Sequence, residues 1–291
     1  MRSSSYNPLS WWCLLWITIS RVLVAQTPIP PPLLPTGTLI NCSFVQSSSW
    51  NTLQGDESIV SARISTRSNY QWNFTPCTFR TTFTTLIGGS YRADSIPQNA
   101  FRLSDNEAFA EAIIVLPLGW MVNPYASANF RTPLTESFAI VGGQRIRTAN
   151  LWDPVTSQQA LGGTYFLGSK TASWSSRLGF TLQQLRAHYH TQQTNDVRTP
   201  EIEAYKAQSG VEWVNEMSAQ IDSSLTYTGR FGMFGSFDDV RVWAVRSENE
   251  LRVKVWKFIG VTWNFTVVQD VRQTRRTQIR QSLTLGIMQD F

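Results

Sequence analysis

Apolar and polar residues alternate along most of this chain, and this two-residue period constrains the fold more than any other feature. Between residues 259 and 267, five apolar residues occupy every second position, namely Ile259, Val261, Trp263, Phe265 and Val267. Successive side chains of a β-strand point to opposite faces, whereas an amphipathic helix repeats every three or four residues. The same alternation recurs in 174–183, 211–221, 225–237 and 251–256, and more weakly in 59–66, 79–87, 108–118 and 120–130. The pattern predicts an all-β protein of about twelve (roughly 10–14) antiparallel strands.

Composition narrows the class of protein further. Charged residues make up only 15% of the chain and aromatic residues 12%, with 12 Trp. A disordered chain would have few aromatics and a high charge density. A helical membrane protein would need an uncharged apolar run of about 18 residues. Beyond the first 25 residues, the longest candidate, Ala108–Val122, is interrupted by Glu111 and Pro117.

The first 25 residues resemble a secretory signal peptide. Arg2 supplies the positive start, Trp11–Ser20 forms the apolar stretch, and Ala25 ends the segment with a small residue. We expect residues 26–37 to form a proline-rich spacer and residues 38–291 to form one barrel domain. Removing Arg2 and Arg21 lowers the net charge from +5 to +3, which gives no reason to expect a nucleic-acid partner.

Alternation alone fits a soluble β-sandwich as well as a membrane barrel. Many of the alternating runs have about ten residues, the length that a tilted strand needs to cross a bilayer. Tryptophans gather near the ends of these runs, as in the aromatic girdles of membrane barrels. The chain closes on Phe291, with Ile287, Leu285 and Leu283 on the same face, which is typical of the signal that barrels present to the barrel-assembly machinery.

These features predict an antiparallel up-and-down transmembrane β-barrel in the outer membrane of a Gram-negative bacterium. Outer-membrane lipid and lipopolysaccharide would then surround it. The alternative is a secreted soluble β-sandwich, such as an adhesin or lectin. Two polar stretches, Gln144–Gln159 and Thr191–Gln208, are expected to be loops. Val240–Trp256 fits either one long strand with a bulge or a hairpin that turns at Ser247–Glu250.

Charges inside the alternating runs are the main functional candidates. Arginine, lysine and glutamate on the polar face would point into the lumen, the candidates being Arg177, Arg230, Arg252, Lys254, Glu212 and Glu216. Charges in a narrow lumen need partners, so these residues would form a salt-bridged interior. The surplus of arginine could instead line an anion-preferring pore. Because twelve strands enclose little space, a packed interior is favoured over an open channel.

An enzymatic function is the competing hypothesis. His188 and His190 could activate one of Ser173, Ser175 and Ser176 in a membrane hydrolase that acts on lipid. No spacing singles out one serine, so a non-enzymatic barrel without metal or cofactor is preferred. Cys42 and Cys77 are the cysteines that remain after the leader, and they are candidates either for a disulfide or for two free or buried thiols.

Several short motifs resemble a family of Bacteroidota outer-membrane β-barrel proteins catalogued as a domain of unknown function. The likeness begins with Q-S-x-x-W and Gly-Asp-Glu-Ser in Gln46–Ser58, and continues with the aromatic-rich Trp72–Tyr91. It then covers, in order, Arg102–Glu107, Pro124–Leu134, Asp153–Phe166, Gly210–Phe237 and Asp239–Asp270. The resemblance implies a barrel fold over nearly all of the mature chain. It implies no activity, because none is established for that family.

Overall fold

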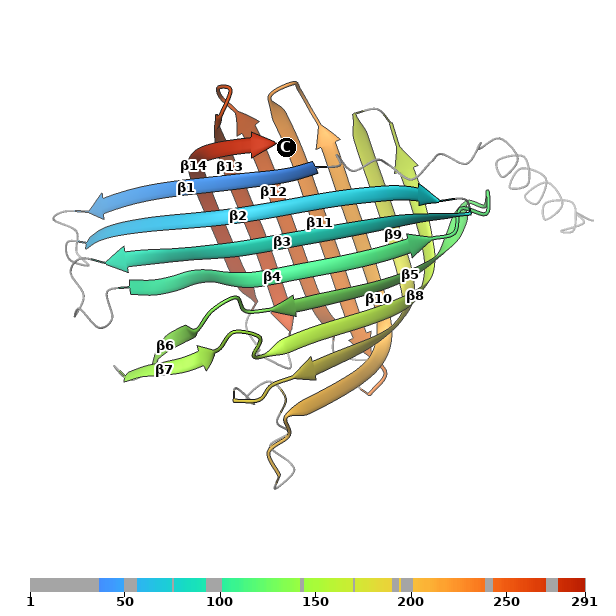
Figure 1. Ribbon diagram of the computed structural model, residues 1–291, viewed down its shortest axis with the longest axis horizontal. Coiled ribbons are helices and arrows are strands. Elements are labelled where there is room, and N and C mark those ends of the chain that lie inside the picture. The colour runs from blue at the N-terminus through green and yellow to red at the C-terminus, as the bar shows by residue number, and fades with distance from the viewer. Residues whose placement is uncertain are drawn as a thin grey trace, which may run out of the picture.

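Twelve β-strands form the wall of a closed barrel, shown in Figure 1. The structure, a computed structural model, describes residues 37–49, 57–74, 76–92, 101–141, 144–169, 171–189, 194, 201–238, 243–270 and 277–290. The wall strands are β1 (Gly37–Ser49), β2 (Glu57–Phe74), β3 (Cys77–Arg92), β4 (Phe101–Val115), β5 (Val122–Thr132), β8 (Val155–Gly168), β9 (Ala172–Arg186), β10 (Tyr205–Gln220), β11 (Leu225–Ser236), β12 (Trp243–Lys254), β13 (Ile259–Asp270) and β14 (Gln278–Asp290).

Each wall strand pairs with the next one along the chain, always antiparallel, and β14 closes the ring on β1. One excursion interrupts this order: β6 (Ser137–Val141) and β7 (Gln144–Ala149) form a separate hairpin between β5 and β8. The predicted all-β, antiparallel, up-and-down β-barrel of about twelve strands is therefore confirmed. The β-sandwich alternative is wrong, because a sandwich consists of two separate sheets and this wall is a single closed one.

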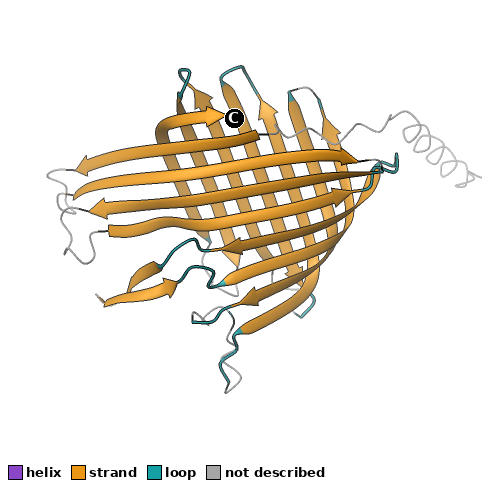
Figure 2. Cartoon of the chain, viewed as in Figure 1, coloured by secondary structure: helices purple, strands orange, loops and turns teal. Residues whose placement is uncertain are grey.

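The two ends of the barrel differ in the number of residues that connect their strands; Figure 2 shows the described turns and loops in teal. At one end, which we call the short-turn end, connections such as residues 169–171 and 221–224 join β8 to β9 and β10 to β11. At the other, the long-loop end, residues 133–154 and 187–204 join β5 to β8 and β9 to β10. The first residue of β1 and the last of β14 both lie at the short-turn end, since Leu39 pairs with Asp290.

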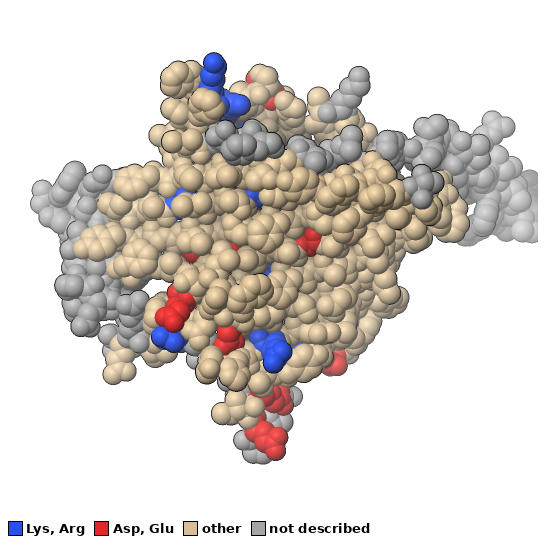
Figure 3. Space-filling view, in the orientation of Figure 1, with Lys and Arg blue, Asp and Glu red and all other residues tan. Residues whose placement is uncertain are grey.

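Apolar side chains point out of the barrel and polar side chains point in. In β9, Trp174, Leu178 and Phe180 are exposed on the outside, whereas Ser175 and Arg177 are buried. Figure 3 shows the result on one face, where most of the surface carries no charged side chains and charges gather towards the edges. A soluble protein buries its apolar face, so this reversed pattern is that of a barrel surrounded by hydrocarbon.

Three local predictions from the sequence differ from the structure. The loop predicted at Gln144–Gln159 is wrong, because this stretch forms β7 and the start of β8. In Figure 1 the β6–β7 hairpin extends beyond the barrel wall. A strand outside the wall does not have one face in the membrane, so its sequence need not alternate between apolar and polar residues. The loop predicted at Thr191–Gln208 is wrong at its end, where β10 begins at Tyr205. Residues 243–254 form the single strand β12, so a hairpin at Ser247–Glu250 is also wrong.

The described residues begin at Gly37 and end at Asp290. Residues 1–36, with the predicted leader and almost all of the spacer, lie outside the described residues, as does Phe291. Leu283, Leu285 and Ile287 all point outwards from β14 and are exposed, as the terminal pattern predicts. Among the described residues, no helix is long and apolar enough to span a membrane.

Candidate functional site

The inner wall carries nearly equal numbers of arginine and carboxylate side chains within the described residues. They share the inward face because alternate residues of a strand point to the same side. The arginines are Arg63, Arg67, Arg80, Arg131, Arg177, Arg230, Arg246 and Arg252, and the carboxylates are Asp105, Glu107, Glu111, Glu212, Glu216, Glu248 and Glu250. The charges of the described inward side chains thus almost cancel.

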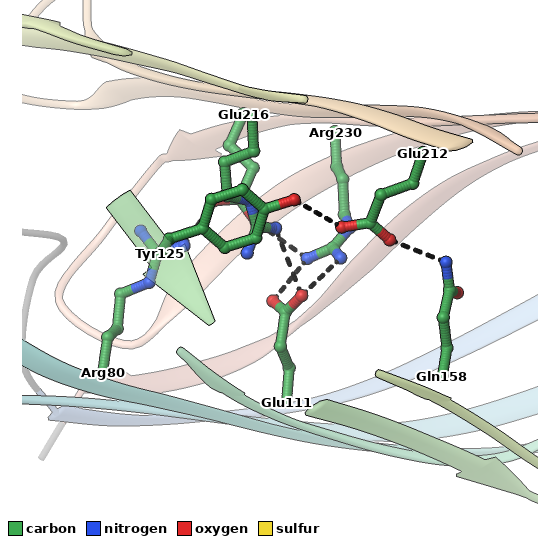
Figure 4. A network of polar contacts seen from close by, with 8 residues as sticks. Arg80, Glu111, Tyr125, Gln158, Glu212, Glu216 and Arg230 are labelled. Atoms are coloured by element: carbon green, nitrogen blue, oxygen red, sulfur yellow. Dashed lines mark hydrogen bonds and ion pairs between the residues drawn. The ribbon is translucent and has the colours of Figure 1, made fainter. Parts of the chain in front are cut away.

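Glu111 of β4 is the centre of the largest ion-pair group, seen in Figure 4. Both of its oxygens accept hydrogen bonds from Arg230 of β11, with Nη1 and Nη2 each 2.8 Å from an oxygen. Arg177 of β9 donates from Nη2 to Oε1 at 3.2 Å. The side chains of Glu111 and Arg177 are each only 2% exposed, so these charges are stabilised by one another and not by bulk water.

Glu216 of β10 extends this group to a further strand. Its Oε2 lies 2.6 Å from Nη2 of Arg80 on β3, and its Oε1 lies 2.7 Å from Nη1 of Arg230. Arg177 also reaches Oε1 at 3.4 Å. We call Arg80, Glu111, Arg177, Glu216 and Arg230 the central ion network. It connects five strands across the interior, because β3 and β4 lie far from β10 and β11 around the ring.

Glu212 is bound by uncharged groups beside the central ion network. Tyr125 of β5 donates its hydroxyl to Oε1 at 2.9 Å, and Gln158 of β8 donates to Oε2 at 2.7 Å. The Tyr125 ring also faces the Arg177 guanidinium, whose carbon lies 5.8 Å from the ring centroid. Gly179 of β9 makes room for this tyrosine, since a Cβ there would lie 2.6 Å from its hydroxyl oxygen.

A second group lies nearer the long-loop end. Arg131 of β5 donates from Nη1 to both oxygens of Glu107 on β4 at 2.9 Å. Arg246 of β12 lies 3.4 Å from the same carboxylate and also pairs with Glu248 on its own strand. Because β4 and β12 stand on opposite walls of the ring, this contact spans the whole lumen.

A third group lies near the junction of β1 and β14. Arg67 of β2 lies 3.7 Å from Glu250 of β12, which Arg252 of the same strand also contacts at 2.5 Å. Arg63 of β2 lies 3.9 Å from Asp105 of β4 and donates to Ser282 Oγ of β14 at 3.1 Å. These contacts join β2 to β12 and β14, so ion pairs or hydrogen bonds cross the interior at several levels.

Towards the short-turn end the interior holds one apolar cluster on β4, β5 and β8, alongside buried polar residues such as Asn41 and Thr262. Ile113 and Val115 of β4 share the inward face with Glu111 and pack with Tyr125 and Ala160, with Phe166 beside them. These side chains fill the space below the charged groups. Taken together, the apolar cluster and the cross-lumen ion pairs place side chains across the interior as well as along its wall.

The predicted site residues are distributed unequally over these groups. Arg177, Arg230 and Glu216 meet in the central ion network, whereas Glu212 lies beside it and binds Tyr125 and Gln158. Arg252 belongs to the third group. Lys254 is exposed at the last position of β12 and is not among the ion pairs found within the described residues.

Sequence reasoning missed Glu111 as a site residue, although a signal was present. It is the single charged residue in the apolar run 108–115, two positions from Ile113, and a buried charge of that kind requires a partner. Tyr125 and Gln158 gave no such signal, because uncharged polar residues occur on the inward face of many of the strands. Their role depends on which strands face each other.

The hydrolase hypothesis receives no support from the described geometry. His188 follows the end of β9 at the long-loop end, where its backbone N–H donates to Asp153 at 2.8 Å. Ser175 lies near the opposite end of the same strand, and Ser176 accepts a hydrogen bond from Trp213. His190 lies outside the described residues. No group of three or more metal-binding side chains occurs among the residues that the structure describes.

Of the two alternatives for the cysteines, the structure has free thiols and not a disulfide, since Cys42 and Cys77 are both free. Cys42 of β1 pairs with Ile64 of β2, which in turn pairs with Ile87 of β3. Ile87 is ten residues from Cys77, which is about 33 Å along the strand at roughly 3.3 Å per residue. A whole strand and most of the wall height therefore separate the two sulfurs.

Comparison with known proteins adds little beyond the fold. No protein-family model and no curated protein matches the sequence. Among solved structures, the chain is similar to the NanC porin, at a TM-score of 0.42 and 9% identity over 86% of this chain and 98% of that one.

Two further solved structures show a similar level of likeness. An outer-membrane channel from Pseudomonas putida F1 gives a TM-score of 0.41 and 10% identity, over 91% of this chain and 100% of that one. The translocator domain of the autotransporter NalP from Neisseria meningitidis gives a TM-score of 0.39 and 8% identity, over 97% of this chain and 96% of that one. At these values the likeness indicates nothing about function, and the fold assignment rests on the chain's own strand pairing.

Proposed function

We propose that this chain is a non-enzymatic outer-membrane β-barrel whose lumen is held closed by ion pairs. A small polar solute would bind or pass only when those pairs rearrange. The single observation that supports this most directly is the central ion network, in which Glu111 and Glu216 hold Arg80, Arg177 and Arg230 from three other strands. A permanently open pore would leave such side chains along the wall, in water.

The proposal places the barrel in a bilayer because its outer face is apolar. Leu161 and Phe180 face each other on β8 and β9, and they are 65% and 70% exposed. Residues of that kind at the middle of a wall are stable only in hydrocarbon. The termini and short turns would face the periplasm, and the long connections would face outwards towards lipopolysaccharide.

The near balance of charge in the lumen favours a closed or weakly selective interior over an anion-preferring pore. The surplus of arginine that the sequence suggested is offset by Glu107, Glu111, Glu248 and Glu250 as well as by Glu212 and Glu216. An anion-selective lumen needs uncompensated positive charge along the path of the ion. The interior of this barrel has little of it.

Export and assembly complete the proposal. The leader-like residues 1–25 support export, and the alternating end of the chain at Phe291 supports recognition by the barrel-assembly machinery. Membership of the Bacteroidota outer-membrane family remains a prediction from the sequence motifs.

Planar-bilayer recording of the purified protein tests the closed lumen. We expect the wild type to be silent and the double variant Glu111→Gln with Arg230→Gln to show discrete conductance steps. This double change removes one negative and one positive charge, so it opens the network without leaving net charge behind. Glu136→Gln with Arg147→Gln, on the exposed β6–β7 hairpin, is the matched control and should stay silent. Large steady conductance of the wild type would refute the closed lumen.

The bilayer placement has its own test. A folded membrane barrel migrates faster in a detergent gel before boiling than after boiling. We expect this heat-modifiable migration for wild type and variants alike. Recovery of the wild type in the aqueous fraction, without detergent, would show that the apolar face is not in a membrane.

A further inference from the structure

The junction between β1 and β14, which we call the seam, is shorter than the two strands allow. The described pairing covers Leu39 with Asp290 through Ser43 with Gly286. On its other side, β1 pairs with β2 along its full length, from Gly37 to Ser49, and β14 pairs with β13 from Ile287 to Gln278. Both strands are therefore regular beyond the point where they stop pairing with each other.

Beyond Ser43 and Gly286, β1 continues along β2 and β14 continues along β13, with no further pairing between β1 and β14 among the described residues. If the pairing continued, Phe44 would meet Leu285 and Ser49 would meet Arg280. In the structure these stretches of β1 and β14 are strands without ladder partners on that side. They belong to the half of the wall nearer the long-loop end, because β1 runs from the short-turn end towards the long loops. Gly286 marks the last pair, where β14 lies directly against the backbone of Cys42 and Ser43.

The seam lies at hydrocarbon depth in the proposed orientation. Phe44, Leu283 and Leu285 point outwards beside it and are 60%, 66% and 57% exposed. Backbone N–H and C=O groups without partners cost several kcal/mol each in hydrocarbon, so an unpaired edge at this depth requires a polar occupant. The outer rim of the seam is nevertheless apolar, so the occupant must also present an apolar part.

Cationic side chains stand immediately behind the unpaired edges. Arg63 of β2 reaches across the seam to donate to Ser282 of β14 at 3.1 Å, with Asp105 3.9 Å from its Nε. Arg67, whose side chain is 37% exposed, is 3.7 Å from Glu250. Arginine is suited to phosphate because its planar group can donate two parallel hydrogen bonds. The inner side of the seam is thus equipped for a phosphate group.

We propose that the seam is a lateral binding site for the phosphate group of an anionic membrane lipid. The phosphate binds Arg63 and the unpaired backbone N–H groups, and the acyl chains lie along Phe44, Leu283 and Leu285 outside. This inference rests on the proposed membrane location, but not on a closed lumen. A β-strand of a second molecule could also pair with the edges. The arginine behind them favours the lipid, since a strand needs no cation.

Native mass spectrometry of the full-length protein in detergent tests this proposal. The probes are phosphatidylglycerol and phosphatidylcholine with the same acyl chains, added at equal concentrations. We expect preferential retention of phosphatidylglycerol and a loss of about tenfold or more in its affinity for Arg63→Gln, since a hydrogen bond to a charged group is lost. Arg63→Lys should restore most of the retention. Arg147→Gln, which removes an arginine of the exposed β6–β7 hairpin, is the control and should bind as the wild type does.

A second variant covers the case in which Arg63→Gln does not fold. Ser282→Asp leaves Arg63 in place and adds a carboxylate at the other edge of the seam, so it should also lower retention of phosphatidylglycerol. Equal retention of both lipids would overturn the proposal, as would displacement of the lipid by inorganic phosphate alone. A dimer that Ser282→Asp abolishes would instead identify a strand partner and overturn it too. Heat-modifiable migration of the same samples shows separately whether the barrel itself is intact.

Discussion

Glu111 of β4 and Arg230 of β11 form a two-pronged ion pair across the lumen, with both nitrogen–oxygen distances at 2.8 Å. The two residues are 119 positions apart in the sequence, and neither strand neighbours the other in the ring. Such a pair fixes the distance between two parts of the wall. It also leaves each partner dependent on the other, because the Glu111 side chain is only 2% exposed.

Glu111→Gln should therefore destabilise the barrel strongly. The change keeps the size of the side chain but leaves Arg230 and Arg177 with less compensation, and breaking a buried ion pair from one side costs about 3–5 kcal/mol. Urea unfolding in lipid vesicles, followed by tryptophan fluorescence, measures the free energy of unfolding. The double variant with Arg230→Gln should lose less than the sum of the two single changes, because the pair is removed as a unit.

The control for this prediction is Glu136→Gln on the β6–β7 hairpin. Glu136 lies 3.2 Å from Arg147, and both side chains are about half exposed. Exposed pairs of this kind contribute about 0–1 kcal/mol. If Glu111→Gln cost no more than Glu136→Gln, the central ion network would not hold the lumen together.

Gly179 should resist substitution because its inward side is filled. A Cβ at this position would lie 2.6 Å from the Tyr125 hydroxyl oxygen and 2.6 Å from the Leu161 carbonyl oxygen. Gly179→Ala should therefore displace Tyr125 from Glu212 and cost about 1–3 kcal/mol, the usual range for overpacking. The same urea titration measures it.

Gly232→Ala is the matched comparison on β11. Its Cβ would meet nothing closer than the Arg246 carbonyl oxygen at 4.0 Å. Because alanine loses less conformational entropy than glycine on folding, this variant should be neutral or slightly stabilising. An equal loss of stability in the two variants would mean that close packing around Tyr125 is not the cause.

Both cysteines of the described chain should react as free thiols. Cys42 and Cys77 lie on different strands, with their sulfurs separated by most of the height of the wall. We expect complete alkylation of both residues in denaturant without any reductant, checked by peptide mass mapping. Alkylation that required a reductant would show a disulfide and contradict the strand register.

The sequence predicts the strands of the barrel wall better than it predicts the contacts between side chains in the lumen. Residues 259–267 alternate so regularly that a strand is the only regular element that fits, and β13 covers them. The β6–β7 hairpin escaped prediction because Gln144–Ala149 belongs to no wall and has no apolar face to repeat. Alternation arises where one face of a strand contacts a membrane or a core. It therefore cannot reveal a strand that contacts neither.

The pairs of residues that meet across the lumen cannot be predicted from alternation. Alternation shows whether a side chain points inwards or outwards, but not how high along the barrel it lies or which strand stands opposite. Arg80 and Glu216 illustrate this, since they are 136 positions apart and meet at 2.6 Å. Their contact depends on the tilt and stagger of twelve strands together, properties of the closed ring and not of any one segment. The kind of interior was therefore predictable, while the identity of its pairs required the structure.

The apolar outer face provides the most direct test of the membrane assignment. Leu161 lies at the middle of β8, points outwards, and is paired with Phe180 of β9. If this position meets hydrocarbon, Leu161→Arg should destabilise the barrel by about 2–4 kcal/mol, as arginine does near the midplane of a bilayer. Ile202→Arg, in the connection before β10 and already 75% exposed, should cost about 0–1 kcal/mol, as arginine does near or beyond the interface. Urea unfolding in vesicles measures both values. In water, replacing an exposed leucine by arginine changes the free energy of unfolding by no more than about 0.5 kcal/mol. Equal stability of the two variants would therefore place this wall in solvent and not in lipid.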